Sequence, residues 1–168
     1  MKYSRLINIS IIIPIRNNSK SLARALIATD NQSLAPDEVI IVDSSTDNAV
    51  YDLTNDFEGD FSIIYHREKK AYPGRARNIG VGLARNDWVA FLDSKTIPSE
   101  DWLERYYHLI EAYHADIVFG VTQFEAEFPF QKVLRAASYG KIGHHTVPGT
   151  LIRKEIFTDS GGFLEHVR

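Results

Sequence analysis

Short runs of branched aliphatic residues alternate along this chain with segments of helical spacing. Residues 8–13 and 38–43 are two such runs, and β-branched runs of this length are typical of buried strands. Pro14, which lacks a backbone N–H, is expected to end the first strand. Between the two runs, Leu22, Ala25 and Leu26 recur at helical spacing.

The alternation continues to the end of the chain. Further strands are expected over 61–65, 87–93, 117–121 and 150–153, and helices over 50–57, 76–83 and, after Pro98, from about Ser99 to 113. Strands that alternate with helices predict βαβ units. The fold class that follows is α/β, a single Rossmann-like domain whose mostly parallel central sheet is flanked by helices.

Length and composition exclude several classes of protein. A chain of 168 residues is one compact domain by size. Its net charge of −3 argues against a nucleic-acid partner, and the absence of cysteine removes disulfides, cysteine–zinc sites and thiol nucleophiles. The N-terminal apolar run is too short for a membrane span or a signal peptide. We therefore expect a cytoplasmic protein that meets a membrane only through segments or partners outside this chain.

Two aspartates, Asp43 and Asp93, each follow a hydrophobic strand. Ligands of parallel α/β sheets bind beyond the carboxyl ends of the strands. There a carboxylate accepts hydrogen bonds from ribose hydroxyls or a base N–H, or binds a divalent metal through oxygen. The alternative for Asp43 is a structural role as a cap of the following turn or helix.

A basic segment spans residues 67–78, just before and at the start of the third predicted helix. It contains five cations: Arg67, Lys69, Lys70, Arg75 and Arg77. Helix N-termini favour anions, and arginine binds phosphate with two parallel hydrogen bonds. The segment therefore predicts a phosphate-bearing ligand, with a solvated basic loop as the alternative. The nearby Gly80-Val81-Gly82 lies inside the predicted helix, so it is not a dinucleotide fingerprint.

Five segments together resemble family 2 glycosyltransferases, in the order that the family shows. Residues 9–17 (ISIIIPIRN) are similar to its opening strand, and residues 39–47 (VIIVDSSTD) to its second strand and acidic turn. Residues 74–80 (GRARNIG) with 88–93 (WVAFLD) resemble its A-R-N-x-G helix and the strand before its D-x-D motif, and residues 97–103 (IPSEDWL) continue the match. Residues 148–154 (PGTLIRK) and 161–163 (GGF) resemble its acceptor-side strand and G-G-F segment.

The resemblance implies a GT-A fold over residues 1–168, with the nucleotide-sugar-binding part at about 1–98 and the start of the acceptor-side part at about 99–168. It implies inverting transfer of a sugar from a nucleotide-diphosphate sugar to a hydroxyl of an unidentified acceptor, in polysaccharide or glycoconjugate biosynthesis. The implied donor-binding residues are Pro14, Ile15, Arg16 and Asn17 around the nucleoside, Asp43 or Ser44 at the base, Arg75 or Arg77 at the base or diphosphate, and Asp93 and Ser94 at the ribose or metal. Gly149 and Thr150 are implied on the acceptor side.

One departure from the family concerns its metal. Where the D-x-D motif stands, this chain has Asp93-Ser94-Lys95. The last acid of that motif normally holds the Mg²⁺ or Mn²⁺ that neutralises the leaving diphosphate, so Asp93 remains the sole candidate ligand. We expect weak or absent metal dependence, with the Lys95 ammonium stabilising the diphosphate. The alternative is that Lys95 points to solvent and donor binding is impaired.

The other departure concerns the catalytic base. In the family it is an acidic pair some way beyond G-G-F, and here the matching position lies past residue 168. We therefore expect a C-terminally truncated domain that binds donor but transfers poorly. Two alternatives remain open: a non-catalytic nucleotide- or nucleotide-sugar-binding module, and a structural α/β domain without a ligand.

Overall fold

The computed structural model describes residues 7–122, 128–130 and 145–166. Within them a six-stranded sheet has the order β3-β2-β1-β4-β6-β5. Neighbours among the first four strands run parallel, whereas β6 runs antiparallel to both β4 and β5. The strands are β1 (Ile9–Ile15), β2 (Glu38–Asp43), β3 (Ser62–Arg67), β4 (Trp88–Phe91), β5 (Ile117–Val121) and β6 (His145–Arg153).

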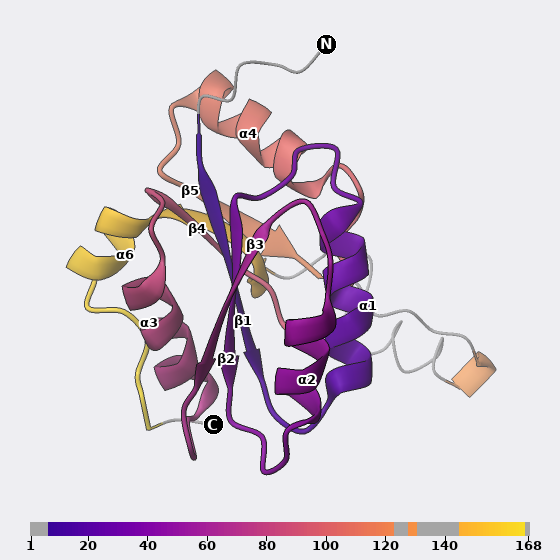
Figure 1. Cartoon of the computed structure of the whole chain (residues 1–168). Coiled ribbons are helices and arrows are strands. Elements are labelled where there is room, and N and C mark those ends of the chain that lie inside the picture. Colours follow the sequence, from indigo (N-terminus) through magenta and orange to yellow (C-terminus); the bar gives the residue numbers. More distant parts are fainter. Residues whose placement is uncertain (1–6, 123–127, 131–144, 167–168) are drawn as a thin grey trace.

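Helices cover both faces of the sheet (Figure 1). They are α1 (Ser19–Asp30), α2 (Ala49–Asp56), α3 (Pro73–Leu83), α4 (Trp102–Tyr113) and α6 (Lys154–Asp159). The apolar side chains of α1, α2 and α4 pack on one face, and those of α3 and α6 on the other. No helix in the described part of the chain is both long enough and apolar enough to cross a membrane.

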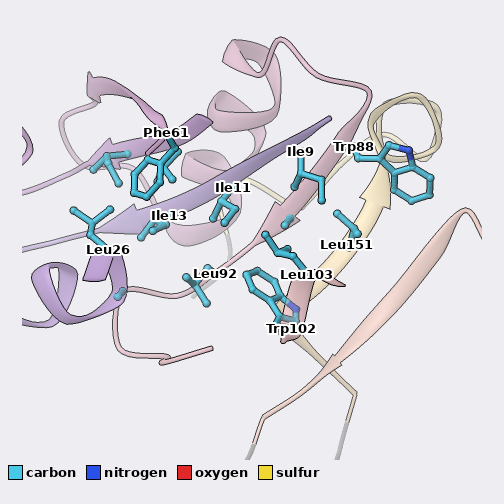
Figure 2. Close-up of a cluster of buried hydrophobic side chains, with 14 of the residues drawn as sticks. Ile9, Ile11, Ile13, Leu26, Phe61, Trp88, Leu92, Trp102, Leu103 and Leu151 are labelled. Carbon is cyan, nitrogen blue, oxygen red and sulfur yellow. The ribbon is translucent and has the colours of Figure 1, made fainter. Parts of the chain in front are cut away.

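The central strand β1 contributes to both cores because successive strand residues point to opposite faces. Ile9, Ile11 and Ile13 face α1 and α4, together with Leu26, Trp102 and Leu103 (Figure 2). Ile12 points the other way, into the core under α3. Burial on both faces explains why β1, β2 and β4 are continuous apolar runs in the sequence and not alternating patterns.

The predicted α/β architecture is confirmed, and the structure differs from the prediction in the bounds of some elements. The fourth helix begins at Trp102 rather than near Ser99, and β6 is longer than the predicted return to the sheet. The short helix α6 was not predicted. Its six residues, KEIFTD, are too few to show helical periodicity.

Pro14 does not end β1, which continues to Ile15. The carbonyl of Ile15 accepts from Ser44 N at 2.9 Å, so Ile15 bonds toward β2 and Pro14 faces the β4 side. Pairing with β4 stops at Ile12, opposite Phe91. The missing N–H of Pro14 therefore removes no ladder hydrogen bond, and the strand tolerates the proline.

Helix α3 packs so closely on β1 that a Cβ at Gly80 would overlap Cγ2 of the fully buried Ile12. By contrast, a Cβ at Gly82 meets nothing within 4 Å. We expect Gly80→Ala to lower the free energy of unfolding by about 1–2 kcal/mol, because overpacking outweighs the gain in helix propensity. Gly82→Ala is the matched control and is expected to raise it by about 0.5–1 kcal/mol. Urea denaturation of both variants checks this prediction, and a loss of equal size in both would contradict it.

Candidate functional site

The carboxyl ends of β1, β2 and β4 meet at one edge of the sheet because these strands are parallel. The first two ends are joined by a hydrogen bond from Asn17 N to Ser45 Oγ at 2.7 Å. Asn17 Oδ1 in turn accepts from Thr46 N at 2.9 Å, and Asn17 has a positive φ of 53°. The loop after β1 is thus held against the turn after β2, with Arg16 and Asn17 exposed and Pro14 and Ile15 behind them.

Asp43 is fully buried at the end of β2, and both of its carboxylate oxygens have partners. Its Oδ1 accepts from Ser45 N at 2.8 Å, and its Oδ2 accepts from Tyr65 Oη at 2.7 Å and Arg67 Nη2 at 3.2 Å. Burial, followed by the hydrogen bond to Asp43, raises the pKa of Tyr65 to about 12, so the phenol stays a donor at neutral pH. The hydrogen bond to Asp43 also raises the pKa of Arg67.

This geometry gives Asp43 the structural role that the sequence left open, at the centre of the turn after β2. A direct contact between its carboxylate and a nucleotide base, which the resemblance implied, requires some of the atoms that bury this side chain to move. Ser44, the other residue implied at the base, is 9% exposed, and its Oγ is 3.5 Å from the Ala71 carbonyl. The contact of either residue with a base stays a prediction.

Arg77 and Asp93 form an ion pair at the carboxyl end of β4, with 2.5 Å between Arg77 Nη2 and Asp93 Oδ1. The arginine side chain is 12% exposed and the carboxylate 42%. The guanidinium also lies over the ring of Phe163, at 5.6 Å from the ring centroid. Its Nε is buried and has no hydrogen-bond partner among the described residues. Two residues implied in donor binding are thus in direct contact, although sequence reasoning did not pair them.

The other cations of the basic segment do not converge on one point. Arg67 bonds Asp43, Asn48 Oδ1 and the carbonyl of Asp47. Arg75 lies between two carboxylates, with 3.3 Å from Nη2 to Glu68 Oε1 and 3.3 Å from Nη1 to Glu165 Oε2. Lys69 and Lys70 are exposed. Each arginine is therefore paired separately, and the anion site expected at the start of α3 is partly filled by the chain's own carboxylates.

Gly149 and Thr150 lie in β6, where the pairing with β5 shifts register. Gly149 has a φ of 87°, and its carbonyl accepts from Trp102 Nε1 at 3.0 Å. Thr150 is 5% exposed, and its hydroxyl accepts from Gly120 N and donates to the Thr146 carbonyl. These contacts stabilise the irregularity in the sheet, and contact with an acceptor stays a prediction for both residues.

The residues at the end of β4 do not fit a divalent metal well. Asp93 already has Arg77 on one oxygen, Ser94 is half-buried, and Lys95 is exposed. Mg²⁺ requires several oxygen ligands, and the positive charges of Arg77 and Lys95 repel a metal cation at this place. Among the residues that the structure describes, no group of three or more His, Cys, Asp or Glu side chains is placed to hold a metal ion.

Two solved structures with the GT-A fold are similar to this chain. S. aureus TarS 1-349 in complex with UDP-GlcNAc matches with a TM-score of 0.74 and 20% identity, over 96% of this chain and 50% of that one. The mannosyltransferase PcManGT of Pyrobaculum calidifontis, in complex with GDP-Man and Mn²⁺, matches with a TM-score of 0.69 and 22% identity, over 96% and 48%. These likenesses establish the fold.

The chain belongs to glycosyl transferase family 2, whose profile matches residues 10–163. It is 36% identical over 100 residues to the pre-mycofactocin glycosyltransferase of Mycobacterium tuberculosis, covering 58% of this chain and 20% of the relative. It is 30% identical over 114 residues to the glycosyltransferase GlyG of Streptococcus pneumoniae, covering 67% and 38%. The chain thus spans less than half the length of these two relatives.

Proposed function

We propose that this chain is the donor-binding part of a glycosyltransferase that moves a sugar from a nucleotide-diphosphate sugar to a hydroxyl of a glycan or glycoconjugate, with inversion and in the cytoplasm. Membership of family 2 supports transfer from a nucleotide sugar in general. TarS and PcManGT, which share the fold, bind UDP-GlcNAc and GDP-Man. Donor binding is the part of this function proposed for residues 1–168, because they include the strand end where Arg77 and Asp93 meet.

The observation that carries the proposal is the Arg77–Asp93 pair at the carboxyl end of β4. Parallel sheets bind ligands at this edge. Arg77 is held by Asp93 on one side and by the Phe163 ring on another, so its orientation is set before a ligand arrives. A preorganised guanidinium suits a diphosphate, which accepts two hydrogen bonds from it.

We infer further that cationic side chains replace much of the metal's role at the diphosphate. Asp93 is already neutralised by Arg77, and Lys95 is exposed two residues further on. A lysine ammonium is a compact charge that stabilises an oxyanion as it develops. Divalent metal dependence is therefore expected to be weak, in contrast to a site with two carboxylates.

A thermal-shift screen of UDP- and GDP-sugars, each with EDTA and with Mn²⁺, tests both proposals. A donor at about 100 times its Kd stabilises the folded chain by about 2.7 kcal/mol, and the shift is expected to be the same in EDTA and in Mn²⁺. Lys95→Asp is expected to make the shift depend on Mn²⁺, whereas Lys69→Asp, a change of the same charge on another exposed lysine, is not. No shift with any donor would exclude donor binding. A thermal shift of the wild-type chain that requires Mn²⁺ would exclude the replacement of the metal by cationic side chains, but not donor binding.

A binding module without transfer is the second candidate, and Lys95 in place of an acid is the observation that favours it. The two functions differ in one measurable product. A transferase releases the nucleotide diphosphate from its donor in the presence of acceptor, whereas a binding module leaves the donor intact.

A further inference from the structure

The segment from Gly161 to Glu165 lies along α3, where Arg75 pairs with Glu165 and the side chain of Asn78 bonds the backbone of Phe163. Asn78 Oδ1 accepts from Phe163 N at 2.9 Å, and its Nδ2 donates to the Phe163 carbonyl at 2.9 Å. The same Nδ2 is 3.2 Å from Glu165 Oε1. One amide thus pairs with both backbone groups of Phe163, as a neighbouring strand would, and so fixes the position of this residue.

Two glycines make this close approach possible. Gly162 has a φ of 71°, and a Cβ there would lie 2.8 Å from Asn78 Oδ1. A Cβ at Gly74, in the first turn of α3, would overlap the carbonyl of Leu164. The backbone of the segment therefore lies directly against the helix, within hydrogen-bond distance of the Asn78 side chain.

Phe163 connects Asn78 to the ion pair. Its ring packs on Phe91 and Phe157, with centroids 5.3 Å apart in each case, so it is anchored in the core under α3. The Arg77 guanidinium lies over this ring, and its Nη2 bonds Asp93. A shift of Phe163 would remove the surface on which Arg77 rests.

We propose that Asn78 is a positioning residue for donor binding, which fixes Phe163 and thereby holds the Arg77 guanidinium toward Asp93 and the diphosphate. This inference rests on the proposed function, because it assigns Asn78 to the same site. Among the described residues, the side chain of Asn78 bonds the Phe163 backbone and the Glu165 carboxylate, and neither group is suited to contact a diphosphate directly. Its substitution is therefore expected to weaken binding of the second phosphate specifically and not nucleotide binding as a whole.

The test compares Asn78→Ala with Asn86→Ala by calorimetry with UDP, UMP, GDP and GMP. Asn86 is a matched control because its Nδ2 also makes a hydrogen bond, to Ser10 Oγ at 3.1 Å, but at the amino ends of the strands. Asn78→Ala is expected to lower the affinity for the nucleoside diphosphate about tenfold, which corresponds to the loss of roughly one charge-assisted hydrogen bond. The affinity for the matching monophosphate is expected to fall less than about threefold. Asn86→Ala is expected to leave the ratio of the two affinities unchanged. Phe163→Leu, which keeps the backbone contacts of residue 163, is expected to reproduce the loss if Asn78→Ala does not fold.

Three results decide the inference separately from the proposed function. An unchanged ratio of diphosphate to monophosphate affinity in both Asn78→Ala and Phe163→Leu overturns it, as does an equal loss in Asn86→Ala. If the wild-type chain binds no nucleotide, the proposed function is wrong, and the ligand-free crystal structure of Asn78→Ala, or of Phe163→Leu, then decides the positional role. That structure is expected to show the Arg77–Asp93 contact broken, and an intact contact would overturn the inference.

Discussion

Asp43→Ala is expected to lower the free energy of unfolding by about 2–4 kcal/mol, because it leaves three donors at the end of β2 without their acceptor. The amide of Ser45, the phenol of Tyr65 and one guanidinium nitrogen of Arg67 all bond this carboxylate. Removal of one partner of a fully buried ion pair usually costs more than the loss expected here. The Arg67 side chain is 32% exposed and keeps its bonds to Asn48 and Asp47, which reduces the loss.

Asp47→Ala is the matched control in the same turn. Its Oδ1 accepts from Ala49 N at 3.1 Å in an exposed position, so its loss is expected to cost less than about 1 kcal/mol. Urea denaturation of the two variants gives the comparison directly. Equal losses would show that the buried network around Asp43 adds nothing beyond an ordinary turn, which would contradict the structural role assigned to this residue.

Arg77→Ala is expected to weaken binding of a nucleotide diphosphate by about 10- to 100-fold, the effect of one or two charge-assisted hydrogen bonds. The substitution also leaves Asp93 without the cation that neutralises it, so an unpaired carboxylate remains beside the incoming phosphates. Arg77→Lys keeps the charge but not the planar fork and is expected to recover only part of the affinity. Isothermal titration calorimetry with UDP and GDP measures both variants.

Arg85→Ala is the control for net charge. Arg85 is a 74% exposed arginine near the end of α3, with 3.9 Å between its Nε and Glu38 Oε2 at the amino end of β2. Its removal changes the total charge of the chain by the same amount as Arg77→Ala, but far from the proposed site. A loss of affinity in Arg85→Ala as large as that in Arg77→Ala would mean that the diphosphate responds to overall charge and not to Arg77.

Sequence patterns predicted most of this fold because its inner strands β1, β2 and β4 are buried on both faces. Such strands are continuous apolar runs, which stand out from the amphipathic helices between them. Pro14 was misinterpreted because the effect of a proline depends on which neighbour its missing N–H faces, and that is a property of the sheet order. Helix α6 was missed because a helix of six residues has no periodicity to detect.

The site was only partly predictable for a related reason. Residue types and strand ends identified Asp43, Arg77 and Asp93, but not which cation pairs with which acid. Asp43 and its partners Tyr65 and Arg67 are 22 and 24 residues apart in the chain, on adjacent strands. The register between β2 and β3, which brings them together, is set by the whole sheet and not by any local pattern.

Asn78 shows a residue for which the sequence did offer a signal. It belongs to the A-R-N-x-G segment that resembles the family, and the G-G-F segment that it binds was recognised as well. No role was predicted for it because the two segments are separated by 85 residues. Their contact depends on the return of the chain through β6 and α6 to the face of the sheet that α3 covers.

A nucleotide-diphosphate sugar is proposed to bind at the carboxyl ends of β1, β2 and β4, around Arg77 and Asp93. Backbone amide NMR with the donor that gives the largest thermal shift locates this binding site residue by residue. We expect the strongest chemical-shift changes at residues 15–17, 43–46, 75–77 and 93–95, and none at the opposite edge around Glu38 and Asn86. Changes centred on that opposite edge, or no change with any UDP- or GDP-sugar, would contradict it.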